Sequence, residues 1–290
     1  MTTLIAQQIL LGLLLGGLYG LAAAGLSLVF GVLKVLDVAH GELIMLGGYG
    51  AFWLFDLLHV DPFASLLLVI PGALLLGALL YAVLFGFVVR AGEETRIKNS
   101  LLVGFGLALA LHALAVRMWT ADDRSITTSY GGAVISVGSL TIPVIRLASL
   151  AVALALIAGL HVLLTRWRWG KAIRATAEDW QAALLTGIDV RRAYLLAFAI
   201  GTALAGAAGT LVSVGYSISP SMGLEWTLKA LIVVVLAGLG SMLGTFVAGL
   251  FVGVAEAVSA AIFGGPYREV VGLVIFVVVL VLRPRGLFGR

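Results

Sequence analysis

Long runs of uncharged, apolar residues dominate this sequence and decide which class of protein the chain can form. Stretches of about 18 or more nearly uncharged residues are long enough to cross a hydrocarbon layer about 30 Å thick. Of the 290 residues, 62% are hydrophobic and only 11% are charged, whereas soluble domains carry about 25% charged residues. The sequence therefore predicts an all-α polytopic membrane protein, because helices satisfy their own backbone groups in lipid.

Eight apolar segments follow one another along the chain. They cover residues 4–30, 41–58, 63–89, 100–119, 146–165, 191–217, 228–261 and 267–282. The first segment has no positively charged region before it and no cleavage site after it, so we expect it to be retained as a span. No linker separates the segments, and residues 1–290 are predicted to form a single transmembrane domain.

Positive charge is concentrated in three of the connections. Twelve of the 18 Lys and Arg residues lie in 90–98, in 166–192 and in the tail from Arg283. Basic loops stay on the cytosolic side of a membrane. We therefore expect these three segments to be cytosolic and the 120–145 connection to lie outside.

Residues 228–261 are too long for one span, since 34 helical residues would extend for about 51 Å. The glycines of Gly238–Ser241 predict a break there, which also gives the odd number of crossings that a cytosolic tail requires. A second interruption, in 31–58, is either a crossing or a re-entrant segment, and it leaves the side of the N-terminus open. About eight or nine transmembrane helices are expected, with paired glycine interruptions that favour an internal repeat.

Small residues recur at four-residue spacing in the apolar segments, a pattern that allows helices to approach closely. We interpret these residues as helix-packing positions. They are Gly12, Gly16 and Gly20; Gly201, Ala205 and Gly209; Gly240 and Gly244; and Gly249 and Gly253.

Ionisable residues crowd the first interruption, VLKVLDVAHGELIML. A charge within a bilayer is costly, so it is expected to face the bundle interior or water. Asp37, His40, Gly41 and Glu42 belong either to a loop at the cytosolic surface or to a re-entrant break lining a pathway. The second break adds Gly240 and Ser241 as pathway or gate candidates. Glu256, alone in an apolar segment, is either pore-facing or hydrogen-bonded between helices.

The 166–192 connection contains KAIRATAEDWQAALLT between Gly170 and Gly187. These residues are strong helix formers, and the flanking glycines are helix breakers. The segment is too polar to cross a membrane and predicts one short cytosolic helix. That helix either caps the bundle or docks a cytosolic partner.

No catalytic or metal-binding pattern is present in the sequence. The chain has no cysteine, its four histidines are far apart, and the HExxH, GxSxG and Walker A patterns do not occur. We therefore expect no metal, no cofactor, no catalytic residue and no ATP site of its own. Nucleic acid is not an expected partner, because Lys and Arg in a membrane protein first report topology.

Four ordered motifs resemble the permease subunits of high-affinity branched-chain amino acid ABC importers, the LivH type. DVAHGELIMLGGY, from Asp37 to Tyr49, is similar to that family's N-F-A-H-G-E-L-x-M-L-G-A-Y signature, with Asp37 in place of Asn. The 166–190 connection is similar to its R-A-x-A-x-D-x-x-A-A-x-x-x-G-I pattern. VVVLAGLGSMLGTFVAGLFVGVAEA and the terminal RPRGLFG resemble its later signatures.

The resemblance implies the partners and the location of the protein. The partners would be a second related permease, two cytosolic ATPase subunits that bind the ATP, and a periplasmic substrate-binding protein, all at a bacterial inner membrane. It also implies that the cytosolic helix couples ATP hydrolysis to transport. The coupling residues would be Arg174, Ala175, Ala177, Glu178, Asp179, Ala182, Ala183, Gly187 and Ile188.

Two other functions stay open at the level of sequence. One is an ABC permease for urea, short amides or aromatic acids. The other is an ion-coupled secondary transporter acting alone, which should carry buried carboxylates for its coupling ion; Asp37 and Glu256 are the candidates.

Overall fold

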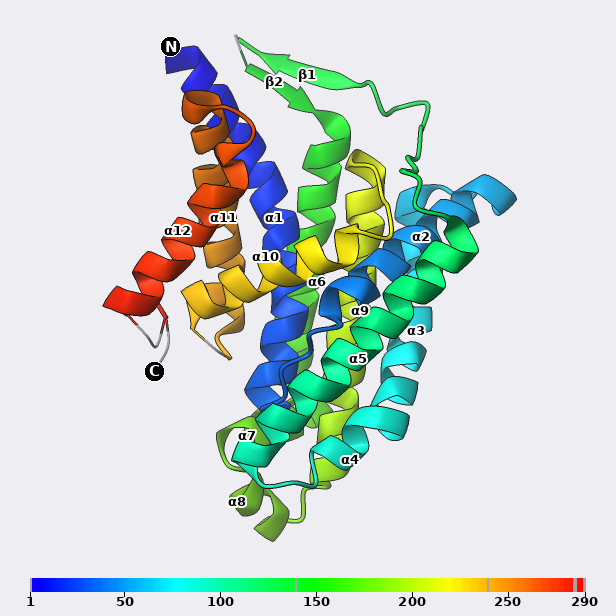
Figure 1. Ribbon diagram of the computed structural model, residues 1–290, viewed down its shortest axis with the longest axis vertical. Helices are drawn as coiled ribbons and strands as arrows, with labels where there is room; N and C mark the ends of the chain where they lie inside the picture. Colours follow the sequence, from blue (N-terminus) through cyan, green and yellow to red (C-terminus); the bar gives the residue numbers. More distant parts are fainter. Residues whose placement is uncertain (1, 139, 239, 284–285, 289–290) are drawn as a thin grey trace.

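The structure of the protein, a computed structural model, describes residues 2–138, 140–238, 240–283 and 286–288 (Figure 1). Helices make up most of these residues. They are α1 (Thr2–Leu33), α2 (His40–Leu58), α3 (Pro62–Leu80), α4 (Gly86–Val88), α5 (Glu93–Trp119), α6 (Val144–Arg166), α7 (Arg168–Glu178), α8 (Trp180–Leu185), α9 (Val190–Gly215), α10 (Met222–Ala237), α11 (Met242–Phe263) and α12 (Tyr267–Leu282). A π-helical turn, η1 (Tyr81–Phe85), joins α3 to α4, and two strands, β1 (Val134–Val137) and β2 (Leu140–Pro143), pair antiparallel.

Within the described residues, seven helices are long and apolar enough to cross a membrane. They are α1, α2, α3 continued to Val88, α5, α6, α9 and α11. The apolar helices α10 and α12 have 16 residues each, which is shorter than a full span. Together, these helices of the described chain confirm the predicted all-α polytopic architecture.

The packing of these helices depends on glycine at the closest crossings. A Cβ atom on Gly16 of α1 would lie 2.7 Å from the carbonyl oxygen of Gly249 on α11. A Cβ atom on Gly209 of α9 would lie 1.8 Å from the carbonyl oxygen of Ile44 on α2. The glycines of α1 and α9, with Gly249 and Gly253 of α11, are therefore helix-packing positions, as predicted, and the buried helices α1 and α9 lie at the centre. The prediction is wrong for Gly240, which lies in the break after α10, and for Gly244, which faces Phe288 of the C-terminal segment.

The N-terminus and the β1–β2 hairpin lie at one end of the molecule, and α7, α8 and the α4–α5 connection lie at the other (Figure 1). Gln7 of α1 binds the backbone of Thr141 in the hairpin at 2.7 Å and 3.0 Å, which fixes the first end. The basic 90–98 and 166–192 connections thus share an end. If that end is cytosolic, the N-terminus is outside; this sidedness, like the internal repeat, stays a prediction.

Candidate functional site

The charged interruption between α1 and α2 is buried inside the bundle. Helix α1 ends at Leu33, where Lys34 takes a left-handed conformation with a φ of 54°. Asp37 is 1% exposed, His40 0% and Glu42 4%. The interpretation as a surface loop is therefore wrong, because the chain turns back within the protein and α2 begins in its interior.

His40 is held against α1. Its Nε2 atom lies 2.9 Å from the carbonyl oxygen of Ala22, and a Cβ atom on Gly25 would lie 3.0 Å from its Cε1 atom. Its Nδ1 atom is 3.7 Å from Oδ2 of Asp37, beyond hydrogen-bonding distance. Asp37 uses its other carboxylate oxygen to accept the Ala39 N–H at 3.1 Å. One aspartate oxygen and one imidazole nitrogen therefore face each other without a hydrogen bond.

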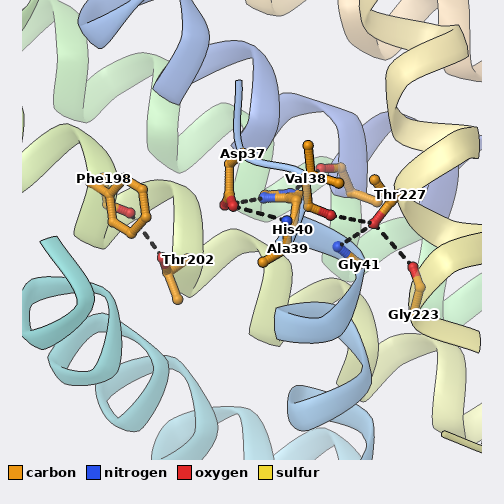
Figure 2. Close-up of polar contacts among 10 residues, drawn as sticks. Asp37, Val38, Ala39, His40, Gly41, Phe198, Thr202, Gly223 and Thr227 are labelled. Atoms are coloured by element: carbon orange, nitrogen blue, oxygen red, sulfur yellow. Dashed lines mark hydrogen bonds and ion pairs between the residues drawn. The ribbon is translucent and has the colours of Figure 1, made fainter. Parts of the chain in front are cut away.

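Thr227 of α10 caps the start of α2 from a distant part of the sequence (Figure 2). The N-cap residue Ala39 has no side chain to accept from the first turn, which leaves backbone donors that need partners. The Gly41 N–H donates to the Thr227 hydroxyl at 2.9 Å, and that hydroxyl lies 3.2 Å from the carbonyl oxygen of Val38 and 3.1 Å from that of Gly223. Sequence reasoning missed Thr227, because a threonine in an apolar helix carries no signal of its distant partner.

Glu42 lies against a glycine of α10. A Cβ atom on Gly223 would lie 2.3 Å from Oε1 of Glu42, and its Oε2 is buried with no hydrogen-bond partner among the described residues. A Cβ atom on Gly41 would lie 1.8 Å from the Gly223 carbonyl oxygen. The two glycines let α2 and α10 cross closely enough to enclose the carboxylate.

The second predicted break is confirmed at its expected position. Helix α10 ends at Ala237 and α11 begins at Met242, with φ values of 96° at Gly238 and 93° at Gly240; Leu239 lies outside the described residues. A Cβ atom on Gly31 of α1 would lie 3.0 Å from the Cα of Gly240. The second break therefore packs against the last turn of α1, which the first interruption follows.

The C-terminal motif closes this second break. The N–H groups of Leu287 and Phe288 donate to the carbonyl oxygens of Leu236 and Ala237, each at 2.8 Å. These carbonyls belong to the last turn of α10, which lacks partners within its own helix. The described part of RPRGLFG therefore acts as a cap for α10, a role that the sequence did not reveal.

Two residues of α5 hold the first interruption from its other side. Arg96, 6% exposed, donates to the carbonyl oxygen of Leu33 at 3.1 Å, and its guanidinium lies 5.9 Å from the ring centre of Tyr194. The hydroxyl of Ser100 accepts the Leu36 N–H at 3.1 Å. A cation at the last carbonyls of α1 suits the negative end of that helix. Arg96 is therefore a buried cap as well as part of a basic connection.

Glu256 is the centre of a buried ion-pair network. Its carboxylate accepts from the Tyr19 hydroxyl at 2.9 Å, pairs with Lys229 Nζ at 2.5 Å and lies 3.4 Å from Arg268 Nε. These groups come from α1, α10 and α12, while Glu256 belongs to α11 and is 0% exposed. The interhelix interpretation is therefore confirmed, since both carboxylate oxygens are engaged between helices; the pore-facing one stays a prediction.

The predicted cytosolic helix is two helices. Asp179 adopts extended angles between α7 and α8, and its carboxylate accepts the N–H groups of Gln181 and Ala182 at 2.8 Å and 3.0 Å. Asp179 is thus the N-cap of α8, and a new helix begins there despite the high helix propensity of its neighbours. Gly170 lies inside α7 rather than before it, whereas Gly187 follows α8 with a φ of 82°, as expected for a helix end.

The candidate coupling residues differ in how far their side chains are exposed to solvent. Ala183 is 4% exposed and packs inward, so it cannot touch a partner directly. Trp180, Leu184 and Leu185 are 43%, 57% and 89% exposed and form an apolar tip that sequence reasoning did not single out. Ala177 and Ile188 are half-buried, and the exposed candidates are Arg174, Ala175, Glu178, Asp179, Ala182 and Gly187.

An apolar pocket of about 300 Å³ lies between α2, α3 and α9, beside the first interruption. Its walls are leucine, valine and alanine side chains and the flat faces of three glycines. The single hydroxyl among these lining residues belongs to Thr202, which donates to the Phe198 carbonyl at 3.1 Å (Figure 2). The lining residues are Leu43, Leu46, Gly47, Gly50, Leu54, Leu68, Val69, Gly72, Ala73, Leu76 and Thr202.

Comparison with known proteins assigns the chain to a family. The family model described as "Branched-chain amino acid transport system / permease component" matches residues 8–282. The permease protein BraD of the high-affinity branched-chain amino acid transport system of Pseudomonas aeruginosa is 31% identical over 294 residues, covering 98% of this chain and 95% of BraD. The corresponding LivH protein of Salmonella typhimurium is 32% identical over 296 residues, with the same coverage.

A solved structure, PsaBC from Streptococcus pneumoniae in complex with Fab, is similar with a TM-score of 0.47 at 14% identity, covering 95% of this chain and 91% of that one. The family match extends from α1 to the end of α12 and includes both interruptions. This chain belongs to the permease components of branched-chain amino acid transport systems.

Proposed function

We propose that the chain is a membrane-spanning permease subunit of an ABC importer for branched-chain or other hydrophobic amino acids. The observation that carries this proposal is a near-complete family match over a bundle whose centre holds a buried, incompletely bonded charged break. Ionisable groups buried at membrane depth mark transport pathways more often than structural positions. Asp37, His40, Gly41 and Glu42 are the proposed pathway or gate residues. Gly240 and Ser241, the other sequence candidates, lie in the uncharged second break, and we propose that they support the bundle instead.

The apolar pocket beside this break supports a hydrophobic cargo. Apart from the Thr202 hydroxyl, its lining is aliphatic or glycine, which suits an aliphatic side chain and offers few partners to a urea or amide group. The same lining suits a small branched side chain better than the polar substituents of substituted aromatic acids.

The partners and the energy source belong to the same proposal. A second related permease completes the pathway, a periplasmic binding protein delivers the amino acid, and two cytosolic subunits bind and hydrolyse ATP. The complex would lie in the bacterial inner membrane, with α7 and α8 on the cytosolic side. The apolar tip of Trp180, Leu184 and Leu185 is the proposed contact with an ATPase subunit, because exposed apolar residues at a polar end mark an interaction surface.

The bonding of Glu256 weighs against an ion-coupled transporter. A coupling carboxylate must be free to exchange its ion, whereas Glu256 is already paired with Lys229 and Arg268. Asp37 keeps one oxygen without a hydrogen bond, but it is bonded to its own loop through the other. Separate ATPase subunits therefore account better for the energy source.

The direct test is uptake by the complete complex in lipid vesicles. With ATP inside and loaded binding protein outside, labelled leucine should accumulate, and omission of ATP should abolish accumulation. Uptake of urea or an aromatic acid in place of leucine would contradict the cargo. Uptake that follows an ion gradient without the ATPase subunits would contradict the whole proposal.

The docking role of the apolar tip has its own test. Leu185→Ser should lose ATP hydrolysis stimulated by the binding protein, together with uptake, while the permease itself keeps its stability. Leu185 is 89% exposed, and such substitutions change stability by less than about 0.5 kcal/mol. Val137→Ser, on the hairpin at the other end and 59% exposed, is the matched control. Normal stimulation in Leu185→Ser would count against docking through α8.

A further inference from the structure

A second cavity lies away from the transport site, where α6 passes into α7 beside the start of α9. Its volume is about 320 Å³, and it is lined by Trp167, Trp169, Arg192, Leu195 and Leu196. Two indole rings and two leucines form its apolar wall, and the Arg192 guanidinium is the charged group in its lining. The translocation and docking roles use none of these five residues.

The cavity lies where the backbone changes direction sharply between α6 and α7. Trp167 takes extended angles between α6 and α7, so the two helices do not form one rod. A Cβ atom on Gly170 would lie 2.1 Å from the Leu163 carbonyl oxygen. Helix α7 therefore folds closely against the end of α6, and the tryptophans on either side of Arg168 are left at the surface beside α9.

The chain segment that carries most of the cavity wall is basic. Between residues 166 and 192 the chain has six cations and three anions, which leaves a net charge of +3. Arg192 is 71% exposed and pairs with Asp189 at 2.9 Å, while Arg168 lies 5.6 Å from the Trp169 ring centre. An apolar wall with a cationic rim is complementary to a ligand that has a hydrocarbon part and a negatively charged head.

The cavity lies just after the end of α6, and this position indicates that such a ligand comes from the membrane. Helix α6 is a candidate membrane span that ends at Arg166, and tryptophan gathers where a span leaves the hydrocarbon. Leu147, Leu154 and Val162 are 40%, 47% and 55% exposed on the same helix. An exposed apolar stripe thus runs along α6 toward the two tryptophans, as an acyl chain would.

We propose that this cavity is a binding site for an anionic phospholipid. The phosphate of the headgroup binds Arg192, and the glycerol and the first part of one acyl chain lie against Trp167, Trp169, Leu195 and Leu196. Basic sites between helices at the cytosolic face hold such headgroups in other membrane proteins. Because α7 leads directly into the α8 tip, the lipid fixes the base of the segment that carries that tip.

The test uses the full-length chain in vesicles and brominated phospholipids, which quench nearby indole fluorescence. Brominated phosphatidylglycerol should quench more strongly than brominated phosphatidylcholine, and Trp167→Phe with Trp169→Phe should remove the difference. Arg192→Gln should weaken the phosphatidylglycerol preference by about fivefold, the effect of losing one cation near a membrane surface. Arg191→Gln, an exposed neighbour that does not line the cavity, should keep the preference.

A second measurement protects the test against a variant that fails to fold. Phosphatidylglycerol retained through detergent purification is counted by mass spectrometry, and Arg192→Gln should retain less than Arg191→Gln at equal melting temperature. Equal quenching by both lipids, or equal retention by both variants, would overturn the proposal. Displacement of the bound lipid by inorganic phosphate alone would also overturn it, since the apolar wall would then contribute nothing.

Discussion

The two interruptions in the apolar helices use opposite means to end a helix inside the protein. The first, between α1 and α2, carries charged side chains and relies on Thr227 of α10 for its cap. The second, between α10 and α11, is uncharged, turns on glycines with positive φ, and is closed by backbone groups of the C-terminal segment. In the part of the chain that the structure describes, the first leaves Asp37 Oδ2, His40 Nδ1 and Glu42 Oε2 without hydrogen bonds. We therefore expect substitutions in the first break to affect transport and substitutions in the second to affect mainly stability.

Replacing Gly41, in the first turn of α2, and Gly240, in the second break, by alanine gives the largest expected difference in stability. Gly41→Ala should destabilise the protein by more than about 3 kcal/mol, because its Cβ meets backbone that cannot move aside. Gly240→Ala should cost only about 1–2 kcal/mol, the penalty for a positive φ, since its Cβ would be 3.6 Å from the nearest atom. Thermal unfolding of the purified permease in detergent measures both, and an equal loss at the two positions would remove the contrast.

Removing the cap of the first break has the next largest effect. Thr227→Val should cost about 1–3 kcal/mol, because the Gly41 N–H is then buried without a partner. Thr245→Val beside the second break is the matched control and should cost about 0.5–1.5 kcal/mol. Its hydroxyl bonds Ser27 and the Ser241 carbonyl, and that carbonyl still accepts the Thr245 N–H. Denaturant unfolding distinguishes the two, and a greater loss for Thr245→Val would contradict the assigned roles.

Neutralising Glu42 is expected to change stability least. It distinguishes a role in transport from a purely structural role. Glu42→Gln keeps the shape of the side chain and should lower ATP-driven uptake by up to about fivefold, the worth of a charge at a helix N-terminus. Ser241→Ala in the second break should leave uptake nearly unchanged. Initial uptake rates at matched membrane levels provide the measurement. Unaltered rates in Glu42→Gln would mean that its carboxylate has no part in the pathway.

The sequence predicted the architecture because membrane spans depend on local composition. The break at Gly238–Ser241 follows from segment length and glycine positions alone. The expected eight or nine spans exceed the seven full-length candidates of the described chain, because α10 and α12 have only 16 residues each. The burial of Asp37, His40 and Glu42 does not, since charged residues favour both a surface loop and an interior break. The caps contributed by Thr227, Arg96 and the C-terminal segment join residues far apart in the chain, and no local pattern encodes them.

The segment that forms α7 and α8 differs from its sequence prediction at Asp179. The residues around Asp179 are strong helix formers, so a continuous helix was the natural expectation. An aspartate followed by a new helical turn is also an N-cap signal, and the structure uses it in that way. Small-residue spacing predicted packing correctly for α1 and α11, but it could not show that Gly16 packs against Gly249.

The closure of α10 by Leu287 and Phe288 also sets an order for biosynthesis. Chains are built from the N-terminus and begin to fold as they emerge, and the segment that pairs with Leu236 and Ala237 follows two further apolar helices. The end of α10 therefore waits for α11 and α12 to insert before its carbonyls find permanent partners. Until then the growing chain carries a helix end whose last carbonyls lack these backbone partners.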